Sequence, residues 1–220
     1  MRIICDFDGT ITRQDTTDLV LERLADRQWA VLQDAWLAGK LSGADCMTGQ
    51  IALVGGSQAD LDAVLDAVQL DPGFAEFVAW CEAMDVPVSI VSDGVDRFID
   101  RILTRAGLDQ VTATANRLEG EPGAWRLELP WREAGCTAGS GVCKCAVSAG
   151  QGPMVYIGDG RSDFCVSAQA DILFAKGALA DHCAAQGRSY YPFDTFHDVR
   201  RRLTMLVGPH PTVLGETAQA

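Results

Sequence analysis

The sequence has no long apolar stretch and is short of positive charge. None of its apolar runs reaches the roughly 18 residues that a membrane-spanning helix needs, and the first run is interrupted by Asp6 and Asp8. We therefore expect neither a membrane anchor nor a signal peptide, and predict a cytoplasmic protein. Lys and Arg number 18 against 30 Asp and Glu, which gives a formal net charge of −12. This balance argues against nucleic acid or an anionic membrane as partner and leaves a small molecule.

The composition is otherwise that of a globular chain. Forty-eight per cent of the 220 residues are apolar, which is enough for one domain with an insertion. Eight cysteines without an export signal are expected to be reduced thiols or metal ligands rather than a disulfide framework. Five of them stand in apolar surroundings and are predicted to fill the core: Cys5, Cys46, Cys81, Cys165 and Cys183.

A short apolar run near the start of the chain ends in two carboxylates. Residues Arg2–Cys5 predict a buried strand, and Asp6 and Asp8 follow it. Side chains two residues apart in an extended segment lie on the same side, so these carboxylates can converge on one point. Two anions this close require a cation, and oxygen ligands favour Mg²⁺. Gly9 then permits a sharp turn, and Thr10 offers a hydroxyl and a backbone N–H. The alternative is an acidic turn that binds nothing.

The rest of the chain alternates between predicted helices and strands. Helices are predicted over 16–39, from Ser42, from Ser57, and over 74–84, 95–106, 142–149, 162–170, 178–186 and 196–207. Strands are predicted over 86–92, 111–118, 125–129, 154–157 and 172–175, with 111–118 and 125–129 as an edge hairpin.

This alternation predicts an α/β fold. Strand, helix and strand in succession imply a doubly wound, Rossmann-like parallel sheet. We expect residues 1–13 and 71–207 to form this core, and residues 14–70 to form a small helical cap inserted after the first strand. Residues 208–220 contain two prolines and two glycines and are expected to be a flexible tail.

Polar residues follow the predicted strands at their carboxyl ends, where a doubly wound sheet binds its ligand. They are Ser92, Asp93 and Gly94 after the second strand, Asp159 and Asp163 after the strand at 154–157, and Lys144 at the start of the helix before it. Each has a simpler explanation taken alone. Ser92 could cap a helix, Asp163 could complement a helix dipole, and Lys144 could be a surface lysine.

The order DxD, then Ser, then Lys, then GDxxxD resembles the four-motif set of the haloacid dehalogenase superfamily, most of whose members are phosphatases with an aspartate nucleophile. The resemblance implies that Asp6 is the nucleophile and Asp8 the general acid and base. It implies that Mg²⁺ is bound by Asp6, Asp8, Asp159 and Asp163, the last as a ligand or a support. Its remaining implied site residues are Thr10, Ser92, Gly94 and Lys144 around the phosphate, and Asp15 and Asp93 near the substrate.

Details of the motifs resemble particular branches of that superfamily. A helical insertion after the first motif, with an acidic residue at Asp15, is similar to the phosphoserine-phosphatase-like branch. CDFDGTIT and the loop CTAGSGVCKC resemble the methionine-salvage phosphatases that act on 2-hydroxy-3-keto-5-methylthiopentenyl 1-phosphate. VSDG and GDGRSDFC resemble the phosphoethanolamine and phosphocholine phosphatases. Asp15 and Asp93 together would suit an amino or quaternary ammonium group, whereas a thioether sugar phosphate needs an apolar pocket.

We therefore predict a Mg²⁺-dependent phosphatase that hydrolyses a small phosphomonoester through an aspartyl-phosphate, as a monomer or homodimer. The methylthiopentenyl phosphate is the preferred substrate, and phosphoserine, phosphoethanolamine and phosphocholine are the alternatives. A non-catalytic module that binds a phosphorylated metabolite is the alternative of another class.

Three cysteines surround Lys144. Cys136, Cys143 and Cys145 have spacings of seven and two and no neighbouring histidine. Three thiolates are one ligand short of a standard zinc site. Zinc completed by a residue from elsewhere, a disulfide and reduced thiols are the three possibilities.

Overall fold

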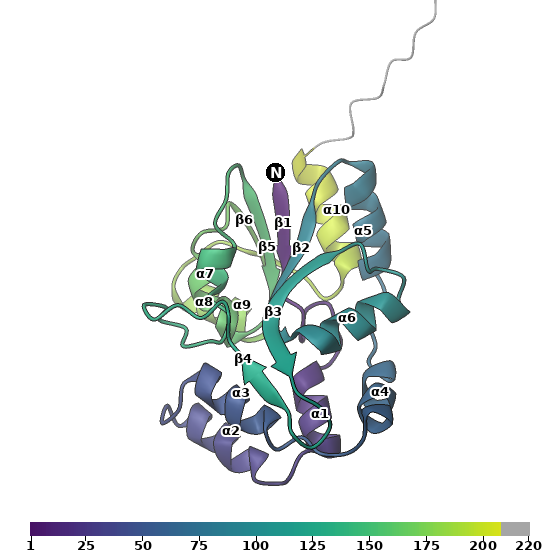
Figure 1. Cartoon of the computed structure of the whole chain (residues 1–220). Coiled ribbons are helices and arrows are strands. Elements are labelled where there is room, and N and C mark those ends of the chain that lie inside the picture. The colour runs from purple at the N-terminus through teal and green to yellow at the C-terminus, as the bar shows by residue number, and fades with distance from the viewer. Residues whose placement is uncertain (208–220) are drawn as a thin grey trace, which may run out of the picture.

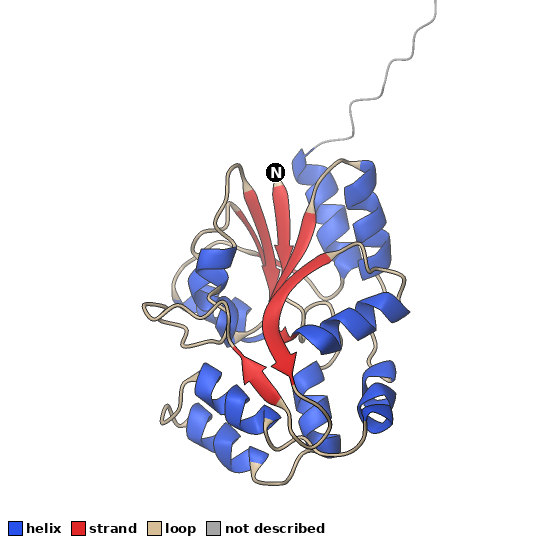
Figure 2. Ribbon diagram, viewed as in Figure 1, coloured by secondary structure: helices blue, strands red, loops and turns tan. Residues whose placement is uncertain are grey.

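The computed structural model describes residues 1–207, and its framework is one seven-stranded sheet (Figures 1 and 2). The strands lie in the order β4-β3-β2-β1-β5-β6-β7, and all neighbours are parallel except β3 and β4. Their bounds are β1 Arg2–Cys5, β2 Val88–Val95, β3 Thr112–Glu119, β4 Arg126–Glu128, β5 Met154–Gly158, β6 Ile172–Ala175 and β7 Tyr191–Pro192. The predicted α/β class is confirmed, and the predicted tail at 208–220 lies outside the described residues.

Helices cover both faces of the sheet, as a parallel sheet requires. One face carries α5 (Phe74–Ala83), α6 (Asp96–Arg105) and α10 (Phe196–Val207). The other carries α7 (Lys144–Val147), the 3₁₀ helix η1 (Arg161–Asp163), α8 (Phe164–Ser167) and α9 (Gly177–Ala185). Each set buries its own apolar cluster, around Phe98 and Phe196 on the first face and around Val166 and Leu179 on the second. Among residues 1–207 no helix is long and apolar enough to cross a bilayer.

A block of four short helices lies beyond the carboxyl ends of the strands (Figure 1). These are α1 (Thr16–Leu24), α2 (Trp29–Leu37), α3 (Gly43–Ile51) and α4 (Gln58–Asp66), which we call the helical block. The predicted single helix over 16–39 is wrong, because Ala25 is extended and bridges to Val54, which separates α1 from α2. The Asp15 side chain caps the N-terminus of α1. Ser42 and Ser57 precede α3 and α4, which start where predicted, and their side chains cap these helices.

Two neighbouring chain segments connect the helical block to the sheet. The backbone N–H of Arg13 donates to the carbonyl of Gln69 at 3.0 Å, and that of Asp71 donates to Ile11 at 2.7 Å. Val20 and other apolar residues of the block belong to the same buried cluster as the first face of the sheet. The block therefore packs directly on the carboxyl edge of the sheet.

Two local predictions need correction. Strand β2 continues past Ser92 to Val95, with a register shift between Val91 and Val95 that breaks its ladder with β3. A shift of this kind bends a strand and redirects its side chains. Cys165 is partly exposed rather than in the core, unlike the other four predicted core cysteines.

Candidate active site

A hollow of about 270 Å³ lies between the carboxyl edge of the sheet and the helical block. From the sheet side it is lined by Asp6, Asp8, Ser92, Asp93, Gly94, Asp159, Gly160, Arg161 and Ser162. From the helical block it is lined by Asp15, Thr17, Asp18, Gln33, Trp36, Gly43, Cys46, Met47 and Gln50. The predicted site residues that do not line it, Thr10, Lys144 and Asp163, contact residues that do. Residues as far apart in the chain as Asp6 and Ser162 thus meet at one edge of the sheet.

A buried lysine joins two of the predicted carboxylates. The Lys144 Nζ lies 2.7 Å from Asp6 Oδ1 and 2.6 Å from Asp163 Oδ1, and its side chain has no exposed surface. Burial by itself would lower the pKa of this ammonium, but the Asp163 and Asp6 carboxylates outweigh burial and raise the pKa. Lys144 is therefore a permanent positive charge directly beneath Asp6.

Both oxygens of Asp163 are fully engaged. Oδ1 accepts from Lys144 Nζ and from the Tyr156 hydroxyl, each at 2.6 Å. Oδ2 accepts from the backbone N–H groups of Asp159 and Gly160, each at 3.0 Å. A carboxylate has about four acceptor positions, so Asp163 is occupied in holding Lys144 and the chain turn after β5.

Asp8 lines the hollow, and one of its two carboxylate oxygens accepts a hydrogen bond. Its Oδ1 accepts from the backbone N–H of Thr16 at 2.8 Å, which connects the loop after β1 to the start of α1. Burial and the neighbouring Asp15 carboxylate raise the pKa of Asp8 to about 7, against the effect of the Thr16 hydrogen bond. Asp8 can therefore hold or release a proton near neutral pH.

The end of β2 supplies a small polar corner beside Asp8. The Ser92 Oγ is buried and accepts from the backbone N–H of Gly94 at 2.9 Å. A Cβ atom at position 94 would lie 2.5 Å from Asp8 Oδ2, so only glycine allows this approach.

Asp93 faces the loop that precedes Lys144. Its Oδ1 accepts from the backbone N–H of Val142 at 2.9 Å, and its carbonyl accepts from Asn116 Nδ2 at 2.6 Å. Burial raises the pKa of Asp93 despite these hydrogen bonds. Asp93 thus connects β2, β3 and the lysine loop while one side of it lines the hollow.

Asp159 completes an acidic group suited to a cation. The Thr10 hydroxyl donates to Asp159 Oδ1 at 2.5 Å, and Asp6, Asp159 and Asp163 each offer an oxygen within 4.8 Å of the others. Burial, then the charge of Asp163, raises the pKa of Asp6, and Lys144 offsets this only in part. Three carboxylates against one ammonium leave an excess of negative charge, so these residues fit a hard divalent cation.

Several residues of this region carried no signal in the sequence. Asn116 lies inside the predicted strand at 111–118, and Tyr156 lies inside the apolar run MVYIG. Each is a polar side chain within a predicted strand, and the sequence does not show which group it hydrogen-bonds to. Apart from Asp15, the side chains from the helical block belong to no motif. Trp36, for example, stacks with the guanidinium of Arg161, 5.6 Å from its ring centre, across the hollow.

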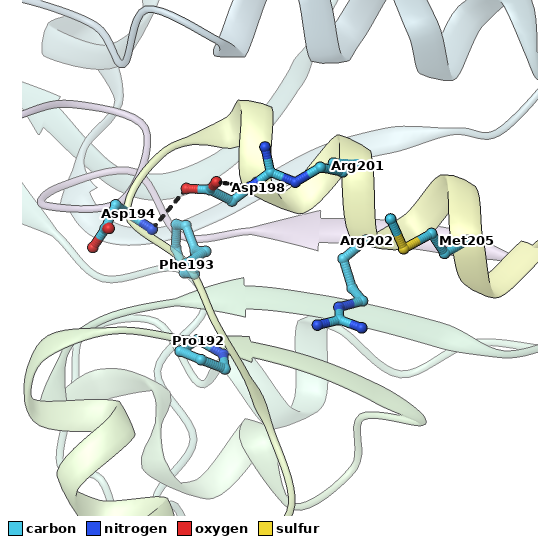
Figure 3. A pocket seen from close by; sticks show the side chains of 7 residues that line it. All are labelled: Pro192, Phe193, Asp194, Asp198, Arg201, Arg202 and Met205. Atoms are coloured by element: carbon cyan, nitrogen blue, oxygen red, sulfur yellow. Dashed lines mark hydrogen bonds and ion pairs between the residues drawn. The ribbon is translucent and has the colours of Figure 1, made fainter.

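A second hollow lies between β7 and α10 (Figure 3). Its volume is about 300 Å³ and its lining comes from residues 192–205. Asp198 is engaged by the backbone N–H of Asp194 and by Arg201, and Arg202 lies over the ring of Tyr191. No predicted site residue reaches this hollow, so it is not the candidate active site.

Comparison with known proteins agrees with this geometry. The family model for haloacid dehalogenase-like hydrolases matches residues 3–167. The 2-hydroxy-3-keto-5-methylthiopentenyl-1-phosphate phosphatase of Brevibacillus brevis is 32% identical over 91% of this chain and 94% of its own. The protein of the same name from Geobacillus thermodenitrificans is 32% identical over 93% and 96%.

Solved structures share the fold at lower identity. A phospho-aspartyl intermediate analogue of phosphoserine phosphatase covers 92% of this chain and 97% of its own, with a TM-score of 0.67 and 20% sequence identity. A substrate-bound phosphoserine phosphatase gives a TM-score of 0.67 at 19% identity, over 92% of this chain and 96% of its own. The family match over most of the chain and the identity to the two bacterial relatives confirm the resemblance: the chain belongs to the haloacid dehalogenase-like hydrolase family.

Proposed function

We propose that this protein hydrolyses a small phosphomonoester, with Asp6 as the nucleophile. The observation that carries the proposal is the position of Asp6, which is buried at the end of β1, lines the hollow and lies 2.7 Å from Lys144. A carboxylate attacks a phosphate dianion only where positive charge reduces their repulsion, and Lys144 supplies a fixed part of that charge.

Asp6 and Asp159 are the residues that would bind Mg²⁺, together with the backbone carbonyl of Asp8. Asp163 supports them, because all four of its acceptor positions are taken by other groups. When bound, Mg²⁺ supplies further positive charge at the phosphoryl oxygens. The Thr10 hydroxyl orients Asp159 for this role.

Asp8 is the general acid and then the general base. In the first step Asp6 forms a bond to phosphorus while Asp8 gives its proton to the leaving oxygen, which departs as an alcohol. In the second step Asp8 takes a proton from water, whose oxygen attacks the aspartyl-phosphate and releases phosphate and free Asp6. A pKa of about 7 suits both directions of proton transfer, and such catalysis contributes roughly 10²–10⁴-fold. Ser92 and Gly94 line the hollow, and the Ser92 hydroxyl and the backbone around Gly94 would donate hydrogen bonds to the transferring oxygens.

The helical block, residues 14–70, acts as a cap over this site. It contributes about half of the lining of the hollow and would exclude water and folded protein substrates. Residues 1–13 and 71–207 then form the catalytic core. Cytoplasmic location and a monomeric or homodimeric state stay predictions.

The proposed substrate is 2-hydroxy-3-keto-5-methylthiopentenyl 1-phosphate. Trp36, Cys46 and Met47 give the cap side of the hollow an apolar and sulfur-rich surface that suits a methylthio group. Gln33 lines the hollow, and its Nε2 can donate to a hydroxyl or keto oxygen. The Gln50 Nε2 already donates to Gln33 Oε1 at 2.9 Å and to the Trp29 carbonyl at 3.4 Å. The named activity of the two bacterial relatives supports the same choice.

Phosphoethanolamine and phosphocholine are the second candidates, because Asp15 and Asp18 also line the hollow and could face an ammonium group. Asp93 supports them less, since its Oδ1 is already bound by Val142.

The test is phosphate release from the methylthiopentenyl phosphate, phosphoethanolamine, phosphocholine and phosphoserine, with Mg²⁺ and with EDTA. We expect the first compound to be preferred and EDTA to abolish turnover. Asp6→Asn should abolish turnover while keeping the unfolding transition, and the matched control is Asp109→Asn, an exposed carboxylate before β3 at the opposite edge of the sheet. Near-normal activity of Asp6→Asn would overturn the mechanism, whereas preference for another compound would overturn only the substrate.

A further inference from the structure

One arginine lines the acidic hollow of the candidate active site. The carboxylates that line this hollow are those of Asp6, Asp8, Asp15, Asp18, Asp93 and Asp159. Among residues 1–207, Arg161 is the one positively charged side chain in its lining, since Lys144 lies beneath Asp6 and does not line it. The few polar groups of a binding hollow fix the orientation of its ligand, so a single cation among carboxylates is a candidate for contact with the substrate.

The guanidinium of Arg161 has hydrogen-bond donors that the protein does not use. Its Cζ lies over the ring of Trp36, 5.6 Å from the ring centre. Within residues 1–207 the guanidinium makes no hydrogen bond and no ion pair. Contact with the face of an aromatic ring engages the charge of a guanidinium and none of its five N–H groups. These N–H groups are therefore available to a ligand.

The backbone that carries Arg161 is held in a defined position. Arg161 begins η1 and follows Gly160 directly. The backbone N–H groups of Asp159 and Gly160 each donate to Asp163 Oδ2 at 3.0 Å, so this turn is fixed by the carboxylate that also holds Lys144. Trp36 belongs to α2, so its contact with Arg161 joins the two sides of the hollow.

Trp36 and Arg161 lie where two hollows meet. A third hollow, of about 310 Å³, is lined in part by residues of the loop before α7 and of α8. It shares with the active-site hollow the residues Trp36, Gly43, Asp93, Arg161 and Ser162. The phosphate must lie at Asp6 to be attacked, so a carbon chain that extends from there toward the third hollow passes Arg161.

We propose that Arg161 is a specificity-determining residue that binds two adjacent oxygens on the carbon chain of the substrate. The guanidinium presents parallel N–H groups in a planar fork, and a hydroxyl and a keto oxygen on neighbouring carbons match that fork. In 2-hydroxy-3-keto-5-methylthiopentenyl 1-phosphate the two oxygens are on carbons 2 and 3. The same positive charge disfavours a substrate with an ammonium group. This inference rests on the proposed phosphatase function and adds the residue that selects the substrate.

Two other roles for Arg161 make a different prediction. If Arg161 bound the phosphate, its loss would weaken every phosphomonoester alike. If its contact with Trp36 served only to hold the helical block on the core, the loss would again be the same for all substrates. Only a contact with oxygens of the carbon chain makes the loss depend on that chain.

The experiment compares kcat/KM for the methylthiopentenyl phosphate with kcat/KM for propyl phosphate, whose carbon chain has neither a further oxygen nor an ammonium group. Arg161→Met keeps an apolar stem against Trp36 and removes the charge and the fork. We expect the ratio of the two values to fall at least about tenfold, mainly through KM for the first compound. Arg161→Lys keeps the charge without the fork and should lower the ratio by less. The matched control is Arg27→Met, an exposed arginine between α1 and α2 that does not line the hollow, and its ratio should stay within about twofold of the wild type.

A binding measurement does not depend on turnover. In the Asp6→Asn background, Arg161→Met should raise the dissociation constant of the methylthiopentenyl phosphate at least about tenfold more than that of propyl phosphate. Equal losses with the two compounds, or a wild-type ratio in Arg161→Met, would overturn the role of Arg161 and leave the phosphatase proposal in place. Absence of Asp6-dependent phosphate release from both compounds would instead overturn the proposed function, and the inference with it.

Discussion

Gly94 is a position at which the site has little room for a side chain. A methyl group there would lie 2.5 Å from Asp8 Oδ2 and 3.0 Å from Ser92 Oγ, whereas ordinary contact begins at 3.4 Å. In Gly94→Ala the Asp8 carboxylate must therefore move by about 0.9 Å, or the end of β2 must move instead. Either change shifts the proposed general acid relative to Asp6.

The expected loss follows from that displacement. A misplacement of about 1 Å can cost about 10²-fold in rate, which corresponds to about 2.7 kcal/mol of activation free energy. We expect kcat/KM of Gly94→Ala to fall by this amount in a steady-state phosphate-release assay with saturating Mg²⁺. The fold should survive, because Gly94 does not have a left-handed backbone.

The matched control is Gly135→Ala, where an added methyl meets nothing within 4 Å and the backbone is again not left-handed. Its kcat/KM should stay within about twofold of the wild type. If Gly94→Ala kept near-normal kcat/KM while retaining its unfolding midpoint, Asp8 would not need its observed position, and the general-acid assignment would fail.

Two further predictions concern pH and stability. Protonated Asp8 is required for the first step and its pKa is about 7, so kcat/KM should fall above about pH 7, close to tenfold per pH unit. Asp15→Asn keeps a capping side chain on α1 but removes a charge that raises the pKa of Asp8, so this alkaline limb should move to lower pH. An unmoved limb would mean that another group titrates there. Asp163→Asn removes one carboxylate from a fully buried ion pair with Lys144 and should cost about 3–5 kcal/mol of unfolding free energy in urea. Asp66→Asn breaks the solvent-exposed pair with Arg101 and should cost much less than Asp163→Asn, so equal losses would contradict the role given to burial.

Local sequence predicted most of the helices and strands, because their signals are short in range. Ser42 and Ser57 were found as helix caps, and the strands after Arg2 and Met154 were found as apolar runs. The break after α1 was missed because it depends on the bridge between Ala25 and Val54, which lie 29 residues apart. β7 was missed because it is a two-residue strand at the edge of the sheet, where pairing with β6 rather than sequence pattern defines it.

The family and the order of its motifs were readable from the sequence alone, because each motif is a local run of residues at the end of a strand. What each side chain contacts was decided only by the tertiary structure. Asp163 meets Lys144 and Tyr156 rather than facing the hollow with a free oxygen, and Cys165 meets the cysteine loop rather than the core. These contacts join residues 7 to 20 positions apart in the helices α7, η1 and α8 and the strand β5, and only packing on the sheet brings such groups together. The motifs in the sequence therefore determined which type of reaction the protein can catalyse. The fold decided which side chains form hydrogen bonds and ion pairs with one another in the site.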